Sequence, residues 1–347
     1  MMDYVIMCLI AGFMALSMLY KAKVNNDDDH FFDIKNTNAM RGFWCLVVMM
    51  VHVPLQYQNR IQDMIGSFAY IGVTFFFMTS GYGLTISADR KGVKGFWKKR
   101  MMKLLTTIWV VNIFASMYYH FVQGNPISIR NILLSWGGWI EWLMGCYVLF
   151  WISYMLFNSF HVWKQVCCIL LALSSMTVYY LSYIDVITAT VWVTECYGFM
   201  WGILLATYRD KFIKFFSKRW IVCLLSSMSV AVLLGFGYLN LKSILFWGEY
   251  VLKIVLSAAI TIFILIVNVR VSFNNKINKI LGELSFEIYL IHGIAFSIVM
   301  RVCNGITSGL FIVLSIILSL VLAITIHVID RKLFSVEHRL FESRRTI

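Results

Sequence analysis

The stretch NAMRGFWCLVVMMVHVP, residues 38–54, sets the character of this chain. It is a mostly apolar run that contains one arginine, Arg41, and one histidine, His52. Eleven steps along an α-helix cover about 16 Å and about three turns, so one helix would carry both side chains on the same face. A guanidinium in hydrocarbon is costly unless it meets an anion, and imidazole is the commonest general base. The stretch therefore predicts a membrane helix that holds a polyanion near one membrane face and removes a proton deeper inside.

The composition agrees with a membrane protein. Of the 347 residues, 60% are hydrophobic and only 14% are charged, which is less charge than a soluble domain of this length carries. The net charge of +13 lies in short clusters between apolar runs, a pattern typical of membrane topology and not of nucleic-acid binding. We therefore expect one polytopic membrane domain in contact with the lipid bilayer, and no sizeable soluble domain.

Long apolar runs recur along the whole sequence, and each is long enough for a membrane helix. They predict an all-α, polytopic transmembrane helical bundle. Its eleven expected helices cover residues 4–20, 38–56, 68–88, 104–122, 137–157, 163–182, 187–207, 219–238, 246–268, 280–301 and 307–329.

The distribution of lysine and arginine predicts the orientation of the bundle. Seven of these residues lie in the segment 89–103, five in 208–219 and five from Arg331 onward, whereas the alternate connections hold few. Because cytoplasmic loops carry the excess of basic residues, we expect the C-terminus inside and the N-terminus outside. Arg41 would then lie near the inner face, with His52 towards the outer half. The loop with Asp27, Asp28 and Asp29 would face the cytoplasm.

Four motifs occur in order along the chain. Arg41 and Gly42 precede His52, and GVTFFFMTSGYGLT (72–85) leads through an aromatic run to Ser80 and Gly81. FWKKR (96–100) has the form Phe-x-x-x-Arg and ends at Arg100, and LGELSFEIYLIHG (281–293) carries Tyr289 and His292. Together, over residues 35–330, these motifs resemble the acyltransferase-3 family of integral membrane acyltransferases.

The resemblance implies a ten-helix acyltransferase core at residues 35–330. Residues 1–34 would then form an additional N-terminal transmembrane helix with an acidic loop, and residues 331–347 a basic cytoplasmic tail. Members of this family move acetyl or other acyl groups onto extracytoplasmic glycans. We therefore expect acetyl-CoA or another acyl-CoA as the donor substrate, with no metal ion. The expected acceptor is a hydroxyl of a cell-surface or lipid-linked sugar, and the expected location is the inner or plasma membrane.

Three residues are the main candidates for the chemistry. His52 is the candidate general base, and its alternative is a structural histidine between helices. Arg41 is the candidate partner of the donor phosphates, since its planar fork suits bidentate contacts, and its alternative is snorkelling to lipid headgroups. The resemblance extends donor binding to Arg100, which would otherwise be ordinary basic charge on the inner face.

Four further residues are candidates for supporting roles. Ser80 and Gly81 either allow close helix packing or open the backbone of an apolar helix beside the reaction centre. Glu287 and His292 lie on one late helix, where they form a relay to His52, or where His292 is structural or binds the acceptor. A transporter or flippase for a surface-glycan precursor is the main alternative function. We find no internal repeat of the kind that many transporters show.

Overall fold

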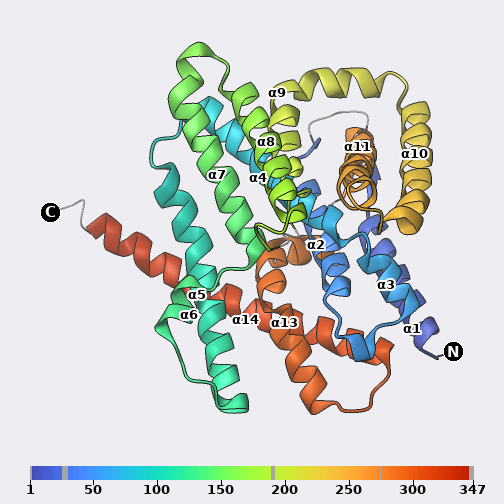
Figure 1. Cartoon of the computed structure of the whole chain (residues 1–347), viewed down its shortest axis with the longest axis vertical. Coiled ribbons are helices and arrows are strands. Elements are labelled where there is room, and N and C mark those ends of the chain that lie inside the picture. The colour runs from blue at the N-terminus through green and yellow to red at the C-terminus, as the bar shows by residue number, and fades with distance from the viewer. Residues whose placement is uncertain (1, 26–29, 189–191, 274, 344–347) are drawn as a thin grey trace.

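The computed structural model describes residues 2–25, 30–188, 192–273 and 275–343, and most of them belong to helices (Figure 1). The acidic residues Asp27, Asp28 and Asp29 and residues 344–347 lie outside the described part. The helices in chain order are α1 (Met2–Leu19), α2 (Ile34–Val51), η1 (Leu55–Tyr57), α3 (Arg60–Gly66), α4 (Ala69–Lys91), α5 (Phe96–Gln123), α6 (Ile129–Leu134), α7 (Gly138–Phe157), η2 (Asn158–Phe160), α8 (Trp163–Tyr183), α9 (Tyr197–Ser217), α10 (Trp220–Leu241), the π-helical turn η3 (Trp247–Leu252), α11 (Lys253–Arg270), α12 (Lys276–Glu283), α13 (Ser285–Val302) and α14 (Ser308–Ser343).

The predicted fold class is confirmed. Within the described residues, eight helices are long and apolar enough to cross a membrane. The shorter apolar helix Tyr4–Leu19 precedes these eight helices in the chain and corresponds to the expected first segment. Each of the eleven expected segments overlaps a helix, so the chain is an all-α polytopic bundle.

Four expected helices differ in detail from those found. The second ends at Val51, so His52 is its C-cap residue and not part of its interior. The seventh begins at Tyr197, about ten residues later than expected. The expected helix 280–301 is divided at Leu284 into α12 and α13, and α14 continues through residue 331, where a separate tail was expected, to Ser343.

Helix α4 is continuous through Ser80 and Gly81, so of the two alternatives considered for these residues the backbone opening is not found. The glycine serves packing instead. A β-carbon at Gly81 would collide with the carbonyl group of Phe199 on α9, and one at Gly202 would collide with the carbonyl oxygen of Met78 on α4. Small residues therefore let α4 and α9 approach backbone to backbone, as membrane helices often do.

The beginning of α2 is fixed by polar side chains. Asp33 caps the helix by accepting a hydrogen bond from the backbone N–H of Asn36 at 2.7 Å. The buried Asn36 side chain donates to the carbonyl oxygens of His30 and Val271, and it accepts from the N–H of Phe273. Next to it, strands β1 (Lys23–Val24) and β2 (Val271–Ser272) pair antiparallel, which ties this end of α2 to the end of α11.

One turn further along, Gly42 of α2 packs against Leu281 of α12, and Gly282 of α12 packs against Asn38. Any β-carbon at either glycine would meet these neighbours at less than ordinary contact distance. This close crossing holds the segment that carries Arg41 against the segment that leads into α13.

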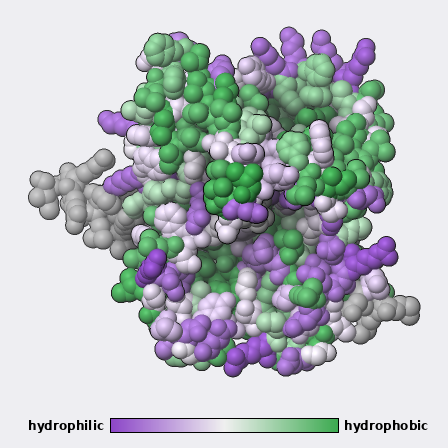
Figure 2. All heavy atoms as spheres, in the orientation of Figure 1, coloured by the Kyte–Doolittle hydropathy of each residue, from purple (hydrophilic) through white to green (hydrophobic). Residues whose placement is uncertain are grey.

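The surface in the orientation of Figure 1 is apolar on both flanks, where the outer helices lie (Figure 2). Hydrophilic side chains gather along the lower margin and at the upper right, and this face is hollowed near its centre. Helix α10 is apolar and lies at the outside of the bundle. Only 6% of its most hydrophobic stretch is buried within the protein. Such a helix is suited to contact with lipid.

Candidate active site

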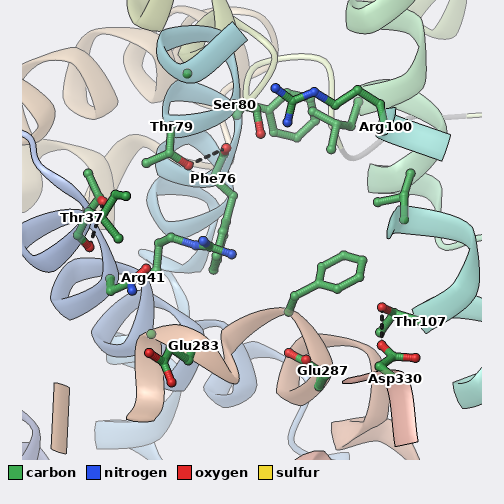
Figure 3. Close-up of a pocket in the computed structure, with 18 of the residues that line it drawn as sticks. Thr37, Arg41, Phe76, Thr79, Ser80, Arg100, Thr107, Glu283, Glu287 and Asp330 are labelled. Atoms are coloured by element: carbon green, nitrogen blue, oxygen red, sulfur yellow. Dashed lines mark hydrogen bonds between the residues drawn. The ribbon is translucent and has the colours of Figure 1, made fainter. Parts of the chain in front are cut away.

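The larger cavity in the bundle has a volume of about 700 Å³, within the usual range for small-molecule sites. Seven helices line it: α2, α4, α5, α7, α12, α13 and α14. Four of the residues predicted from sequence belong to its lining, namely Arg41, Ser80, Arg100 and Glu287. The fold therefore brings together residues from four of its helices that are far apart in the chain (Figure 3).

Arg41 extends from α2 towards the middle of the cavity (Figure 3). Its guanidinium lies 5.5 Å from the ring centroid of Phe76, a distance at which a cation interacts favourably with an aromatic face. Its Nε atom is buried and has no hydrogen-bond partner among the residues that the structure describes. A buried charged donor without an acceptor is costly, so the site is suited to an anionic ligand.

Arg100 enters the cavity from α5, on the side opposite Arg41 (Figure 3). Arg100 and Lys99 also line a second cavity of about 500 Å³, which includes Lys91 at the end of α4 and Lys94 from the connection between α4 and α5. Phe96, the first residue of this motif, is buried against the rings of Tyr147 and Phe150, which anchors the start of α5. The two cavities thus share two cations, and basic side chains continue from one into the other.

The wall formed by α13 and α14 carries the carboxylates Glu287 and Asp330 together with His327 and Arg331. Oε1 of Glu287 lies 2.6 Å from Nδ1 of His327, and the hydroxyl of Thr107 on α5 donates to Oδ2 of Asp330. In Figure 3 Glu287 and Asp330 lie along the lower edge of the cavity, away from Arg100. The cavity therefore has a cationic side, with Arg41 and Arg100, and a wall of mixed charge, which biases how a charged ligand can lie in it.

His52 is not among the described residues that line this cavity. It lies beyond the last residue of α2, and its side chain is exposed. Its Nδ1 is 2.9 Å from the carbonyl oxygen of Val48. In the neutral tautomer that donates from Nδ1, Nε2 keeps its lone pair and can accept a proton. The ring of His292 lies edge to face against His52, with centroids 4.8 Å apart.

Tyr289 links the histidine pair to the cavity. Its ring centroid is 5.8 Å from that of His292, one turn away on α13. On its other side it contacts two rings that line the cavity, with centroid distances of 4.7 Å to Trp139 and 6.0 Å to Phe76. An aromatic path thus runs from the cationic cavity to His52, along the length of α2.

The predicted site residues fall into three places. Arg41, Ser80, Arg100 and Glu287 line the cavity, His52 and His292 form a pair beyond it, and Gly81 packs against α9. Glu287 directs its carboxylate to His327, so it forms a pair between α13 and α14 and not the relay that was one of the alternatives for Glu287 and His292.

His327 and Asp330 are among the cavity residues that the sequence did not single out. Both lie at the end of the apolar run of α14, in SLVLAITIHVIDRK (319–332). An ionisable residue inside such a run is itself a signal of function, and here two of them occur three residues apart, on one face of the helix.

The fold and cavity define a polytopic membrane protein with a cationic site for a ligand. The family model of the acyltransferase-3 domain, described as an acyltransferase domain, matches residues 34–328, which is most of the chain. The chain belongs to this family of membrane acyltransferases, and the resemblance seen in its motifs is confirmed. No curated protein and no solved structure matches the chain significantly.

Proposed function

We propose that this membrane acyltransferase moves an acetyl or other short acyl group from cytoplasmic acyl-CoA to a hydroxyl of a cell-surface or lipid-linked glycan. One observation carries the proposal. A buried, unpartnered arginine donor inside α2 and an imidazole with a free ring nitrogen at the C-cap of the same helix lie about 16 Å apart by helix rise. An extended donor with phosphates at one end and a thioester at the other fits that separation.

The cationic side of the cavity would hold the phosphates of the donor. Arg41 and Arg100 lie on opposite sides of the cavity and can approach one polyanion from both. The guanidinium fork pairs well with phosphate oxygens, and the aromatic face of Phe76 supports one of the two cations. Ser80, between them on α4, offers a hydroxyl to the same ligand.

The pantetheine arm would then follow the aromatic path past Trp139 and Tyr289 towards His52. There Nε2 of His52 takes the proton from the sugar hydroxyl while the oxygen of this hydroxyl forms a bond to the acyl carbon of the donor. The bond between this carbon and sulfur breaks, and the CoA thiolate leaves and takes up the proton held by His52. The neighbouring ring of His292 orients His52 for this step.

The orientation that we propose places the N-terminus outside and the C-terminus in the cytoplasm of the inner or plasma membrane. The concentration of lysine and arginine in 89–103 and 208–219 supports it. The second, basic cavity lies at the first of these segments, so the donor would enter from the cytoplasm.

The experiment that tests the proposal uses the purified full-length protein in detergent with acetyl-CoA and a glycan acceptor. Release of CoA that depends on the acceptor, together with the mass of the acylated glycan, is the expected result. Mass spectrometry of surface glycans from cells with and without this chain identifies the acceptor. Absence of acceptor-dependent turnover with every surface glycan from such cells would contradict the proposal.

A further inference from the structure

The cavity that holds Arg41 and Arg100 contains a histidine of its own. His327 of α14 lines it, and its Nδ1 lies 2.6 Å from Oε1 of Glu287 on α13. This pair takes no part in the transfer step described above, which uses His52 at the other end of α2. A histidine and a carboxylate in direct contact, inside the donor cavity, therefore need their own explanation.

The geometry of the pair suits acid–base chemistry. The carboxylate of Glu287 accepts the Nδ1–H of His327, which fixes the ring and leaves Nε2 as the nitrogen that can take a proton. The side chain of His327 is 22% exposed and that of Glu287 is 8% exposed, so the imidazole is the more open of the two. A buried carboxylate that orients an accessible imidazole is the arrangement that activates weak nucleophiles in many hydrolases.

The surroundings hold the pair in place. Asp330 follows His327 by three residues on α14 and accepts a hydrogen bond from Thr107 of α5. Three helices, α5, α13 and α14, are thus joined by polar contacts around the imidazole. The cavity is also lined by charged side chains such as Lys99 and Glu283, which hold water in preference to lipid.

We propose that Glu287 and His327 form a second acid–base site that hydrolyses the acyl-CoA thioester with water when no glycan acceptor is present. The inference rests on the proposed function for the identity of the donor only. In this second mode the donor phosphates lie against the basic side chains of the adjoining cavity, which shares Lys99 and Arg100 with the first, so that the thioester lies beside His327. Water gives a proton to Nε2 of His327 while its oxygen forms a bond to the acyl carbon. The bond from this carbon to sulfur breaks, and the proton on His327 passes to the sulfur. The products are a carboxylic acid and CoA with a free thiol.

The test measures free CoA released from acetyl-CoA by the purified full-length protein without acceptor. Chromatography serves better than a thiol reagent, because the chain itself has eight cysteines. His327→Ala should lower the rate of CoA release by a factor of about 10²–10⁴, which is the usual contribution of a general base. The rate measured without protein sets the lower limit of this loss. Added imidazole should restore part of the loss by entering the space left by the side chain. His120→Ala is the matched control, since His120 is exposed at the end of α5 and should leave the rate unchanged.

Three results would overturn the inference. They are a wild-type rate equal to that without protein, an unchanged rate in His327→Ala, and a loss in His327→Ala that imidazole does not restore while thermal unfolding shows a folded protein. Glu287→Gln gives a second, independent test, because it keeps the size of the side chain and removes the charge that orients the imidazole.

Calorimetry with CoA separates this inference from the proposed function. A protein that binds CoA and acylates glycan without hydrolysis contradicts the second site alone, whereas a protein that does not bind CoA contradicts both.

Discussion

The imidazole rings of His52 and His292 lie edge to face with their centroids 4.8 Å apart, although they come from opposite ends of the chain. His52 ends α2, and His292 lies in the middle of α13 and is buried. The contact brings the residue of the first family motif against the residue of the last. It indicates that the two motifs build one centre, with His292 as the neighbour that limits the rotation of His52.

This contact predicts a positioning role for His292. Replacement of His292 by alanine removes the ring contact with His52, a kind of contact worth about 0.5–1.5 kcal/mol, so glycan acylation should fall by roughly tenfold at most. His292→Phe keeps a ring in place and should recover part of this loss. The measurement is the initial rate of glycan acylation at saturating acetyl-CoA. A loss as large as that of His52→Ala would instead make His292 a direct participant in proton transfer.

The second prediction concerns the donor site. Arg41→Ala should weaken CoA binding by about 1.5–3 kcal/mol, the value of hydrogen bonds to charged groups. Arg41→Lys should restore only part of this, because a lysine cannot offer the bidentate fork. Calorimetry with CoA and with dephospho-CoA measures the effect, and Arg60→Ala on α3 serves as the control because Arg60 is exposed and outside the cavity. Equal affinity in Arg41→Ala and the unsubstituted protein would remove Arg41 from the donor site.

The third prediction concerns topology. A cysteine placed by Lys94→Cys, in the connection between α4 and α5, should resist an impermeant thiol reagent added from outside the cell. A cysteine placed by Asn125→Cys, after the other end of α5, should react. The unsubstituted protein gives the baseline, because Cys8 is itself exposed. Reaction at position 94 with protection at 125 would reverse the orientation and move the donor cavity to the outer side.

The fourth prediction concerns packing. Gly202→Ala should lower the free energy of unfolding by about 1–3 kcal/mol, because its β-carbon meets the backbone of α4 at Met78 and Tyr82. Gly237→Ala on α10 is the matched control. Its β-carbon meets nothing within 4 Å, so the substitution should be neutral or stabilise by up to about 1 kcal/mol. Thermal unfolding in detergent compares the two variants, and equal midpoints would contradict the close packing of α4 on α9.

The sequence predicted the bundle and part of the cavity well, because apolar runs and motif spacing are local features. Arg41 and Arg100 could be assigned to one site only through the family resemblance, since no pattern within α2 or α5 shows that the two helices face one cavity. The pair of Glu287 and His327 depends on the packing of α13 beside α14, which only the folded chain reveals.

The position of His52 differs from the expectation for a reason visible in the sequence. Pro54 follows two residues later, and a residue before proline is driven out of the helical region, so α2 ends at Val51. The late start of α9 has a similar origin. The residues VITATVWVT (186–194) are rich in valine and threonine, which lower helix propensity, and residues 189–191 of this stretch lie outside the described part.

The most direct test of the account is the rate of glycan acylation by His52→Ala. General-base assistance is worth roughly 10²–10⁴ in rate, so the variant should lose that much turnover while it stays folded and binds CoA with unchanged affinity. His120→Ala, treated in the same way, should keep the full rate. Near-normal glycan acylation by folded His52→Ala protein would contradict the assignment of His52 as the base, and with it the mechanism proposed for this enzyme.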